Sequence, residues 1–148
     1  MISDTKKWFE VAAPHPTDTS RTVQTGCHFE EVMENIEAID CCHIPSTESL
    51  IQDAYVALRK LSEHLKESHV KLSVDDPVEH LDSLCDQIVT AVGVAHMYGY
   101  DIVGALAEVN RSNFSKFQNG KPIFNEHGKI AKGPDYTPPN LSEFVKDE

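Results

Sequence analysis

The stretch from Asp75 to His96 constrains the fold of this chain more than any other, because its apolar residues keep the period of an α-helix throughout. They recur at steps of three and four residues, so they form one stripe that a helix can bury. The stripe consists of Leu81, Leu84, Ile88, Val92 and Ala95. Asp75 is placed to cap this helix, and Pro77 suits its first turn. We therefore expect a long helix that packs on other helices through one face.

The same stretch carries acidic residues beside that stripe, at the same helical steps. They are Glu79, Asp82 and Asp86. Side chains three and four residues apart are neighbours on a helix, so these carboxylates repel one another unless a cation lies between them. Taken alone, such a helix is more often a solvated acidic surface than a binding site.

A second segment, from Phe29 to Asp40, repeats this arrangement of acids on one side and apolar residues on the other. Its acids are Glu30, Glu31, Glu34 and Glu37, and its apolar residues are Phe29, Val32 or Met33, Ile36 and Ile39. If the two helices pack together, four carboxylates meet at one point. A cluster of carboxylate oxygens is a site for a hard cation such as Mg²⁺.

The acidic balance of the chain limits its partners. Its 148 residues carry a formal net charge of -11, so we expect no broad contact with nucleic acid or with an anionic membrane. No apolar run is long enough to span a bilayer, and the first residues do not have the pattern of a signal peptide. We therefore expect a cytoplasmic protein. It could still handle a phosphorylated substrate if metal ions supply the positive charge.

Four cysteines, some of them next to histidines, raise the question of a zinc site. They are Cys27, Cys41, Cys42 and Cys85, with His28 and His43 alongside. Their spacing matches no common zinc module, because it contains no C-x-x-C pair. Thiols in a reducing compartment are the expected state.

The periodicity predicts an all-α protein, a four- to five-helix bundle with an extended C-terminal tail. The length suits one domain over residues 1–148, with a helical body at about 1–117 and the tail at 118–148. The expected helices run from Met1 to Ala13, Ser20 to Asp40, Ser46 to Val70, Asp75 to about Met97, and Asp101 to Phe117.

The third of these helices has an apolar stripe between Leu50 and Leu65. The charged residues scattered on its other sides look like ordinary solvated surface, namely Lys60, His64, Lys66, Glu67 and Lys71. After residue 117 the composition changes to turn residues, with a small hairpin around residues 123–130. The segment from Lys129 to Phe144 has too many prolines for a helix and too many apolar residues for a free end, so we expect a strap laid over the body.

The acidic helices and the C-terminal segment together resemble a known superfamily. Glu30-Glu31-Val32-Met33-Glu34 matches the E-E-x-x-E half of the signature of the all-α nucleoside triphosphate pyrophosphohydrolases, the MazG and phosphoribosyl-ATP pyrophosphohydrolase superfamily. WFEVAAPHPT, QTGCHFEEV and EVNRSNFSKFQNGKPIFNEHGKIAKGPDYTPPNL are similar to segments of a MazG-like branch common in phages and bacteria. The likeness extends from Trp8 to Leu141, and its long C-terminal motif is its most specific part.

This resemblance implies the MazG-like helical bundle and hydrolysis of a nucleoside triphosphate to the monophosphate and pyrophosphate. It implies Mg²⁺, for which Mn²⁺ can substitute, and the expected catalytic ligands are Glu31, Glu34, Asp82 and Asp86. Glu30 and Glu79 are expected in the outer shell. The sequence departs from the second half of the signature, E-x-x-D, because Ser83 stands where the Glu before Asp86 belongs. Asp82, one position earlier, is expected to take its place.

The resemblance also implies a substrate site and an assembly. Arg111 and Lys116 are expected to meet the phosphates, Asn113 a phosphate or the sugar, and Lys132 the phosphates from the tail. The family assembles as dimers or dimers of dimers. A homodimer also follows from the stripe between Leu50 and Leu65 and from the aromatic residues Trp8, Phe9 and Tyr55, which a single set of helices leaves uncovered.

Two other functions stay open at this point. Ser83 is consistent with a catalytically weak, nucleotide-binding or regulatory protein of the same fold. The acidic face is also consistent with a helical protein-interaction module. Nothing in the sequence selects a base or a sugar.

Overall fold

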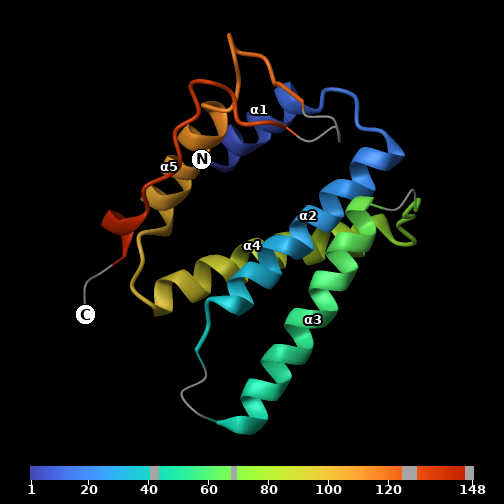
Figure 1. Cartoon of the computed structure of the whole chain (residues 1–148), viewed down its shortest axis with the longest axis vertical. Helices are drawn as coiled ribbons and strands as arrows, with labels where there is room; N and C mark the ends of the chain where they lie inside the picture. Colours follow the sequence, from blue (N-terminus) through green and yellow to red (C-terminus); the bar gives the residue numbers. More distant parts are fainter. Residues whose placement is uncertain (41–43, 68–69, 125–129, 146–148) are drawn as a thin grey trace. The chain divides into compact units, whose positions relative to one another are not determined.

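The chain is built from helices, as expected. The computed structural model describes residues 1–40, 44–67, 70–124 and 130–145 (Figure 1). Over these residues it contains five α-helices and one short 3-10 helix. They are α1 (Ile2–Ala12), α2 (Asp18–Glu37), α3 (Pro45–Glu67), α4 (Pro77–Met97), α5 (Ile102–Phe114) and η1 (Ser142–Phe144). The all-α class is confirmed, and each expected helix is present with its ends shifted by a few residues.

The chain divides into two compact units. The terminal unit comprises Met1–Pro14 and Asp75–Glu148, and the central unit comprises His15–Val74. The terminal unit therefore contains α1, α4, α5 and the tail, whereas the central unit contains α2 and α3. Each unit is described by itself.

In the central unit, α2 and α3 pack against each other as an antiparallel helical hairpin (Figure 1). Thr17 caps α2, because its Oγ1 accepts a hydrogen bond from the backbone N–H of Ser20 at 3.1 Å. Gly26 is buried where the helices come closest. A Cβ atom there would lie 2.9 Å from Lys66 Cγ and 3.0 Å from the carbonyl oxygen of Ser62. The absence of a side chain at Gly26 is therefore what allows the close approach.

In the terminal unit, Trp8 anchors α1 to α5. Its ring stacks on Phe117, with centroids 5.6 Å apart and planes inclined by 9°. Its indole N–H donates a hydrogen bond of 2.8 Å to the carbonyl oxygen of Asn113. Thr5 Oγ1 also donates to Oδ1 of the buried Asn110 at 2.9 Å. Trp8 and Thr5 therefore hold α1 on the last turns of α5.

α4 starts one residue later than the sequence suggested. Asp76 is its N-cap, and this carboxylate accepts hydrogen bonds from the backbone N–H groups of Val78 (2.9 Å) and Glu79 (3.1 Å). The prediction of Asp75 as the cap is therefore wrong by one position. The helix ends as expected, with Gly99 in the left-handed conformation at φ 73°.

The apolar stripe of α4 is mostly exposed. Ala95 is buried, but Leu81 is 62% exposed and Val92 is 46% exposed. An apolar cavity of about 460 Å³ lies between α1, α4 and α5, with Phe9, Ile88 and Leu106 among its lining residues. The terminal unit thus buries Ala95 but leaves apolar side chains along the whole length of α4 accessible.

The tail after α5 packs on the terminal unit as the expected strap. An isolated antiparallel bridge joins Gln118 to Lys121, and another joins Phe124 to Ile130. The second lies where a small hairpin was predicted, but its turn, residues 125–129, lies outside the described residues. The chain then continues in extended form to η1. There Phe144 accepts a backbone hydrogen bond of 2.9 Å from the N–H of Asp101, at the start of α5.

Two further expectations bear on the environment of the chain. No described helix is by itself long and apolar enough to cross a membrane, although α4 and α5 together reach that length and composition across a bend of 119°. Cys27 and Cys85 are not joined in a disulfide. Cys41 and Cys42 lie outside the described residues.

Candidate functional site

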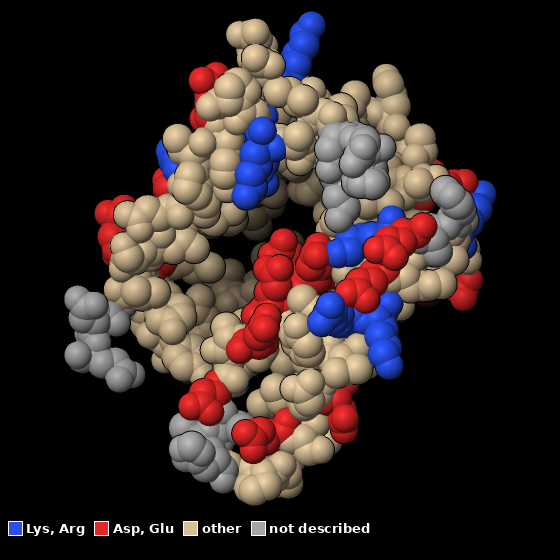
Figure 2. Space-filling view, in the orientation of Figure 1, with Lys and Arg blue, Asp and Glu red and all other residues tan. Residues whose placement is uncertain are grey.

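The first half of the predicted metal site lies on α2. Glu31 and Glu34 are exposed on this unbroken helix, one turn apart. Figure 2 shows acidic side chains gathered along α2, with basic side chains beside them. Glu30, predicted for the outer shell, forms an ion pair of 2.5 Å with Lys66 of α3. Both of the α2 carboxylates predicted as ligands therefore lie on the surface of the helix.

The second half lies on α4, where the predicted ligands are again exposed. Asp82 and Asp86 stand one turn apart, with Glu79 at the start of the helix. Thr90 Oγ1 donates a hydrogen bond of 2.8 Å to the backbone carbonyl of Asp86, so this hydroxyl leaves the Asp86 carboxylate available. Ser83, which replaces the expected Glu, is exposed as well.

The predicted ligand set is divided between the two units. Glu31 and Glu34 belong to the central unit, whereas Asp82 and Asp86 belong to the terminal unit. Over the residues that the structure describes, no group of three or more His, Cys, Asp or Glu side chains is arranged to hold a metal ion. Each unit supplies one pair of carboxylates at helical spacing, and their convergence stays a prediction.

Lys66 differs from its sequence-based interpretation. It was expected on the solvated surface of α3, but its side chain is only 11% exposed and its ammonium group is held by Glu30. The prediction fails because the helical period alone does not show how closely α2 approaches α3 at Gly26, where the Lys66 stem is in contact. Lys66 therefore brings a positive charge beside the acidic residues of α2.

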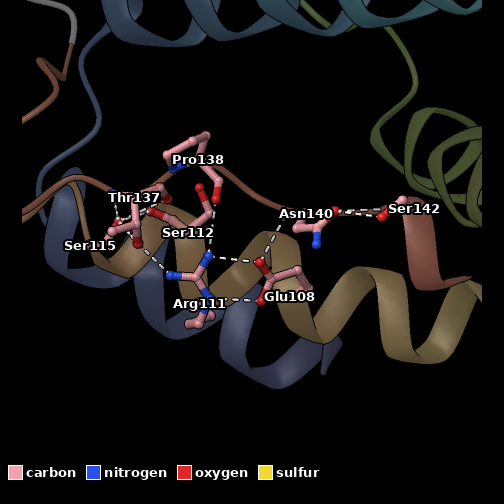
Figure 3. A network of polar contacts seen from close by, with 8 residues as sticks. All are labelled: Glu108, Arg111, Ser112, Ser115, Thr137, Pro138, Asn140 and Ser142. Atoms are coloured by element: carbon pink, nitrogen blue, oxygen red, sulfur yellow. Dashed lines mark hydrogen bonds and ion pairs between the residues drawn. The ribbon is translucent and has the colours of Figure 1, made fainter.

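Arg111, predicted to bind phosphate, lies at the centre of a polar network (Figure 3). Its Nε and Nη2 atoms donate to the two carboxylate oxygens of Glu108, both at 2.7 Å. Nη1 donates to Thr137 Oγ1 at 2.5 Å, and Nη2 also donates to the carbonyl oxygen of Pro138 at 3.1 Å. A phosphate at Arg111 would have to replace these bonds to the tail.

Glu108 completes this network, and the sequence analysis did not single it out. The backbone N–H of Asn140 donates to Glu108 Oε1 at 3.0 Å. Hydrogen bonds from Arg111 first, and from Asn140 second, lower the pKa of Glu108 from 4.5 to about 2. A Glu three residues before an Arg on a helix is the signal that could have indicated this pair. Glu108 and Arg111 together fasten the tail to α5.

The structure brings together the other residues predicted for substrate binding at the end of α5. Lys116 Nζ donates to Asn113 Oδ1 at 2.7 Å and lies 5.9 Å from the centroid of the Trp8 ring. The tail passes the same place, because a Cβ atom at Gly133 would lie 3.0 Å from the carbonyl oxygen of Lys116. Lys132 stacks its ammonium 4.9 Å above the ring of Tyr136.

Comparison of the chain with protein-family models, curated proteins and solved structures finds no significant match.

Proposed function

We propose that this protein is a magnesium-dependent nucleoside triphosphate pyrophosphohydrolase, which hydrolyses an NTP or a dNTP to the monophosphate and pyrophosphate. The observation that carries the proposal is the pair of exposed carboxylates on each of two unbroken helices, Glu31 and Glu34 on α2, and Asp82 and Asp86 on α4. The resemblance of the acidic motif and of the C-terminal segment to MazG-like proteins supports it. The MazG-like form of the bundle is part of the same proposal.

The chemistry of these donors fits the proposed cation. All four are carboxylates, which are the ligands that Mg²⁺ and Mn²⁺ prefer over sulfur. Because the side chains are exposed, they can change rotamer to meet a cation without disturbing the core. When bound, Mg²⁺ neutralises phosphate oxygens and lowers the pKa of a coordinated water.

The residues of the chain itself have two tasks in this proposal. The carboxylates of α2 and α4 repel a triphosphate on their own, so substrate binding at them depends on the cation. The paired Asn113 and Lys116 are oriented by Trp8 and offer an ammonium and an amide to phosphate or sugar oxygens. Arg111 and Lys132 would join them only if their contacts with the tail rearrange.

A substrate panel tests the proposed function. All common NTPs and dNTPs are incubated with the protein and Mg²⁺, and the monophosphate and pyrophosphate are both quantified. The expected result is equimolar release of the two products from at least one nucleotide, with no release when EDTA is added. Absence of both products from every nucleotide would contradict the proposal.

Ser83 favours a second candidate, a catalytically weak nucleotide-binding protein of the same fold. Ser83 cannot supply the carboxylate that the resembled motif has at this position. The proposed metal site therefore depends on the carboxylate of the neighbouring Asp82. Metal-dependent binding of a nucleotide without turnover would select this candidate. Absence of both binding and turnover would favour a helical protein-interaction module, for which the exposed apolar side chains of α4 offer a surface.

A further inference from the structure

A pocket of about 330 Å³ lies between α2 and α3 within the central unit, on the helix that also carries Glu31 and Glu34. Its polar lining alternates acids and bases and includes one tyrosine and one serine. These residues are Glu30, Tyr55, Arg59, Ser62, Glu63 and Lys66. The volume is at the low end for ligand sites, so the pocket suits a small ligand or one group of a larger ligand.

Ser62 points to a ligand in this pocket. Its side chain is 2% exposed, and its Oγ atom has no hydrogen-bond partner among the described residues. Buried hydroxyl groups in folded proteins nearly always have a partner, because leaving one unsatisfied costs about 1–3 kcal/mol. An oxygen atom of a bound molecule would satisfy this hydroxyl once the side chains that cover it in the pocket move aside.

Two basic residues of α3 have donors to spare on either side of Ser62. Lys66 donates to Glu30 at 2.5 Å, and an ammonium group has three hydrogens to donate. Arg59 donates to Glu63 through Nε at 2.9 Å, which leaves both terminal nitrogens of the guanidinium outside that ion pair. The pKa of Arg59 is raised, mainly by its ion pair with Glu63 and to a smaller extent by its interaction with Tyr55. The pocket therefore has more donors than its own acids use.

We propose that this pocket binds a phosphoryl oxyanion. The guanidinium of Arg59, the hydroxyl of Ser62 and the ammonium of Lys66 are donors on successive turns of α3. A phosphoryl group offers these donors three acceptor oxygens, whereas a carboxylate offers two. Glu30 and Glu63 make the pocket neutral and hold the two cations in place, so the anion has to compete with them. The choice of a phosphoryl group rests on the proposed function, whereas the donor surplus and the buried hydroxyl do not.

Direct binding without metal tests the pocket. Inorganic pyrophosphate is titrated into the protein by calorimetry in EDTA, which removes any contribution of the carboxylate site. Ser62→Ala and Arg59→Gln are each expected to weaken binding about tenfold, the loss of one hydrogen bond to a charged group. Lys60→Gln is the matched control, because Lys60 is an exposed cation of the same helix that does not line the pocket.

Glu30→Gln separates a binding pocket from a merely structural ion pair. It releases Lys66 and removes a negative charge, so pyrophosphate should bind several-fold more tightly. Ser62→Ala should leave the melting temperature unchanged or raise it, because it deletes an unsatisfied hydroxyl, and any lost affinity is then not caused by unfolding. No pyrophosphate binding to wild-type protein, or equal losses in Arg59→Gln and Lys60→Gln, would overturn the proposal.

A second titration identifies the source of the phosphoryl group. Tighter binding of inorganic pyrophosphate than of a nucleoside monophosphate supports a pocket for the released diphosphate, and the reverse order supports a pocket for the nucleotide itself. Failure of the proposed function looks different from failure of the pocket. If pyrophosphate binds without metal but no nucleotide is hydrolysed, the pocket stands and the hydrolase does not.

Discussion

Gly26 lies within the contact between α2 and α3, where it has no room for a side chain. Replacing it with Ala places a Cβ atom 2.9 Å from Lys66 Cγ and 3.0 Å from the carbonyl oxygen of Ser62. The lysine stem can move, but the backbone carbonyl belongs to the facing helix. We predict that Gly26→Ala lowers the free energy of unfolding by about 1–3 kcal/mol, as overpacking usually does. Urea denaturation measures this change.

Gly93→Ala is the control for that prediction. Gly93 also lies inside a helix, α4, but a Cβ atom there would meet nothing within 4 Å. Alanine favours the helix over glycine, so this change should raise stability by about 0.5–1 kcal/mol. If both substitutions shifted stability equally, the close approach at Gly26 would not be real.

Glu108 should make the tail sensitive to acid. Its pKa is lowered in the folded protein from 4.5 to about 2, so its contribution to stability is fully present above pH 4.5. That contribution is lost as the pH falls from 4.5 towards 2, because the carboxylate that holds Arg111 and the Asn140 N–H becomes protonated. We predict that the nuclear magnetic resonance signals of the Thr137 and Asn140 amides move in this interval.

The variant Glu108→Gln should show the shifted amide signals already at neutral pH. Glu143→Gln is the control, because Glu143 is an exposed acid of the same tail, in η1. Tail amides that keep their wild-type positions in Glu108→Gln would show that the network in Figure 3 does not fasten the tail.

At the scale of elements, the sequence predicts what depends on local rules. Helical periodicity places all five α-helices, and the structure adds side-chain caps at Thr17 for α2 and at Asp101 for α5. The cap of α4 was misplaced because two aspartates stand side by side and both suit the position, and the Pro77 that follows Asp76 occupies the first turn in either case. Local rules cannot separate such neighbours.

Contacts between elements were harder to predict, because they depend on which residues a second helix approaches. Trp8 reaches Phe117 and Arg111 reaches Pro138 across long stretches of sequence. The strap was predictable from its composition, since prolines exclude a helix and apolar residues need cover. Its attachment through Glu108, and the burial of Lys66, were not.

The tail provides the prediction that belongs to this scale. Deleting everything after Gln118 removes the tail partners of Arg111 and the contact of Phe144 with Gly104. We predict that turnover of the nucleotide falls more than helicity measured by circular dichroism, because the deletion removes Lys132 and the tail segment that passes Lys116 but leaves the helices. Lys132→Ala is the comparison. A lower melting temperature on truncation, together with unchanged kcat and KM in Lys132→Ala, would mean that the tail has only a structural role.

At the scale of the whole molecule, α4 carries more exposed apolar surface than a helix usually leaves in water. Val78 is 79% exposed, Val89 is 65% exposed and Met97 is 83% exposed. Trp8, expected to contribute to an interface, packs on Phe117. The α3 stripe is uncovered at Leu50 but buried at Leu65. Helical proteins bury such stripes against another helix. The exposed apolar residues of α4 and α3 therefore support the proposed homodimer.

We predict that light scattering at micromolar concentration gives at least twice the chain mass of 16.5 kDa. Val89→Asp should reduce that mass, because a charge in an apolar interface is costly. Val70→Asp, which changes an exposed valine outside the helices, should not. A monomer in the wild-type protein would contradict the dimer.

The proposed site could be predicted from the sequence only as two halves. The spacing of Glu31 and Glu34, and of Asp82 and Asp86, follows from the helical period, and the structure exposes all four side chains. Their meeting is a property of tertiary or quaternary packing, which no local pattern specifies. The central claim of a shared metal site therefore rests on a functional measurement.

That measurement is the rate of pyrophosphate release from the preferred nucleotide in Glu34→Gln and Asp86→Asn. Each change removes a charged ligand from a different unit while keeping the size of the side chain, so both should abolish magnesium-dependent turnover and leave the circular dichroism spectrum unchanged. Glu37→Gln, an exposed acid of α2 outside the proposed set, should retain activity. Removing even an outer-shell partner of a metal typically lowers activity at least about tenfold. If Glu34→Gln and Asp86→Asn both kept more than about a tenth of the wild-type rate, the proposed metal site would therefore be wrong.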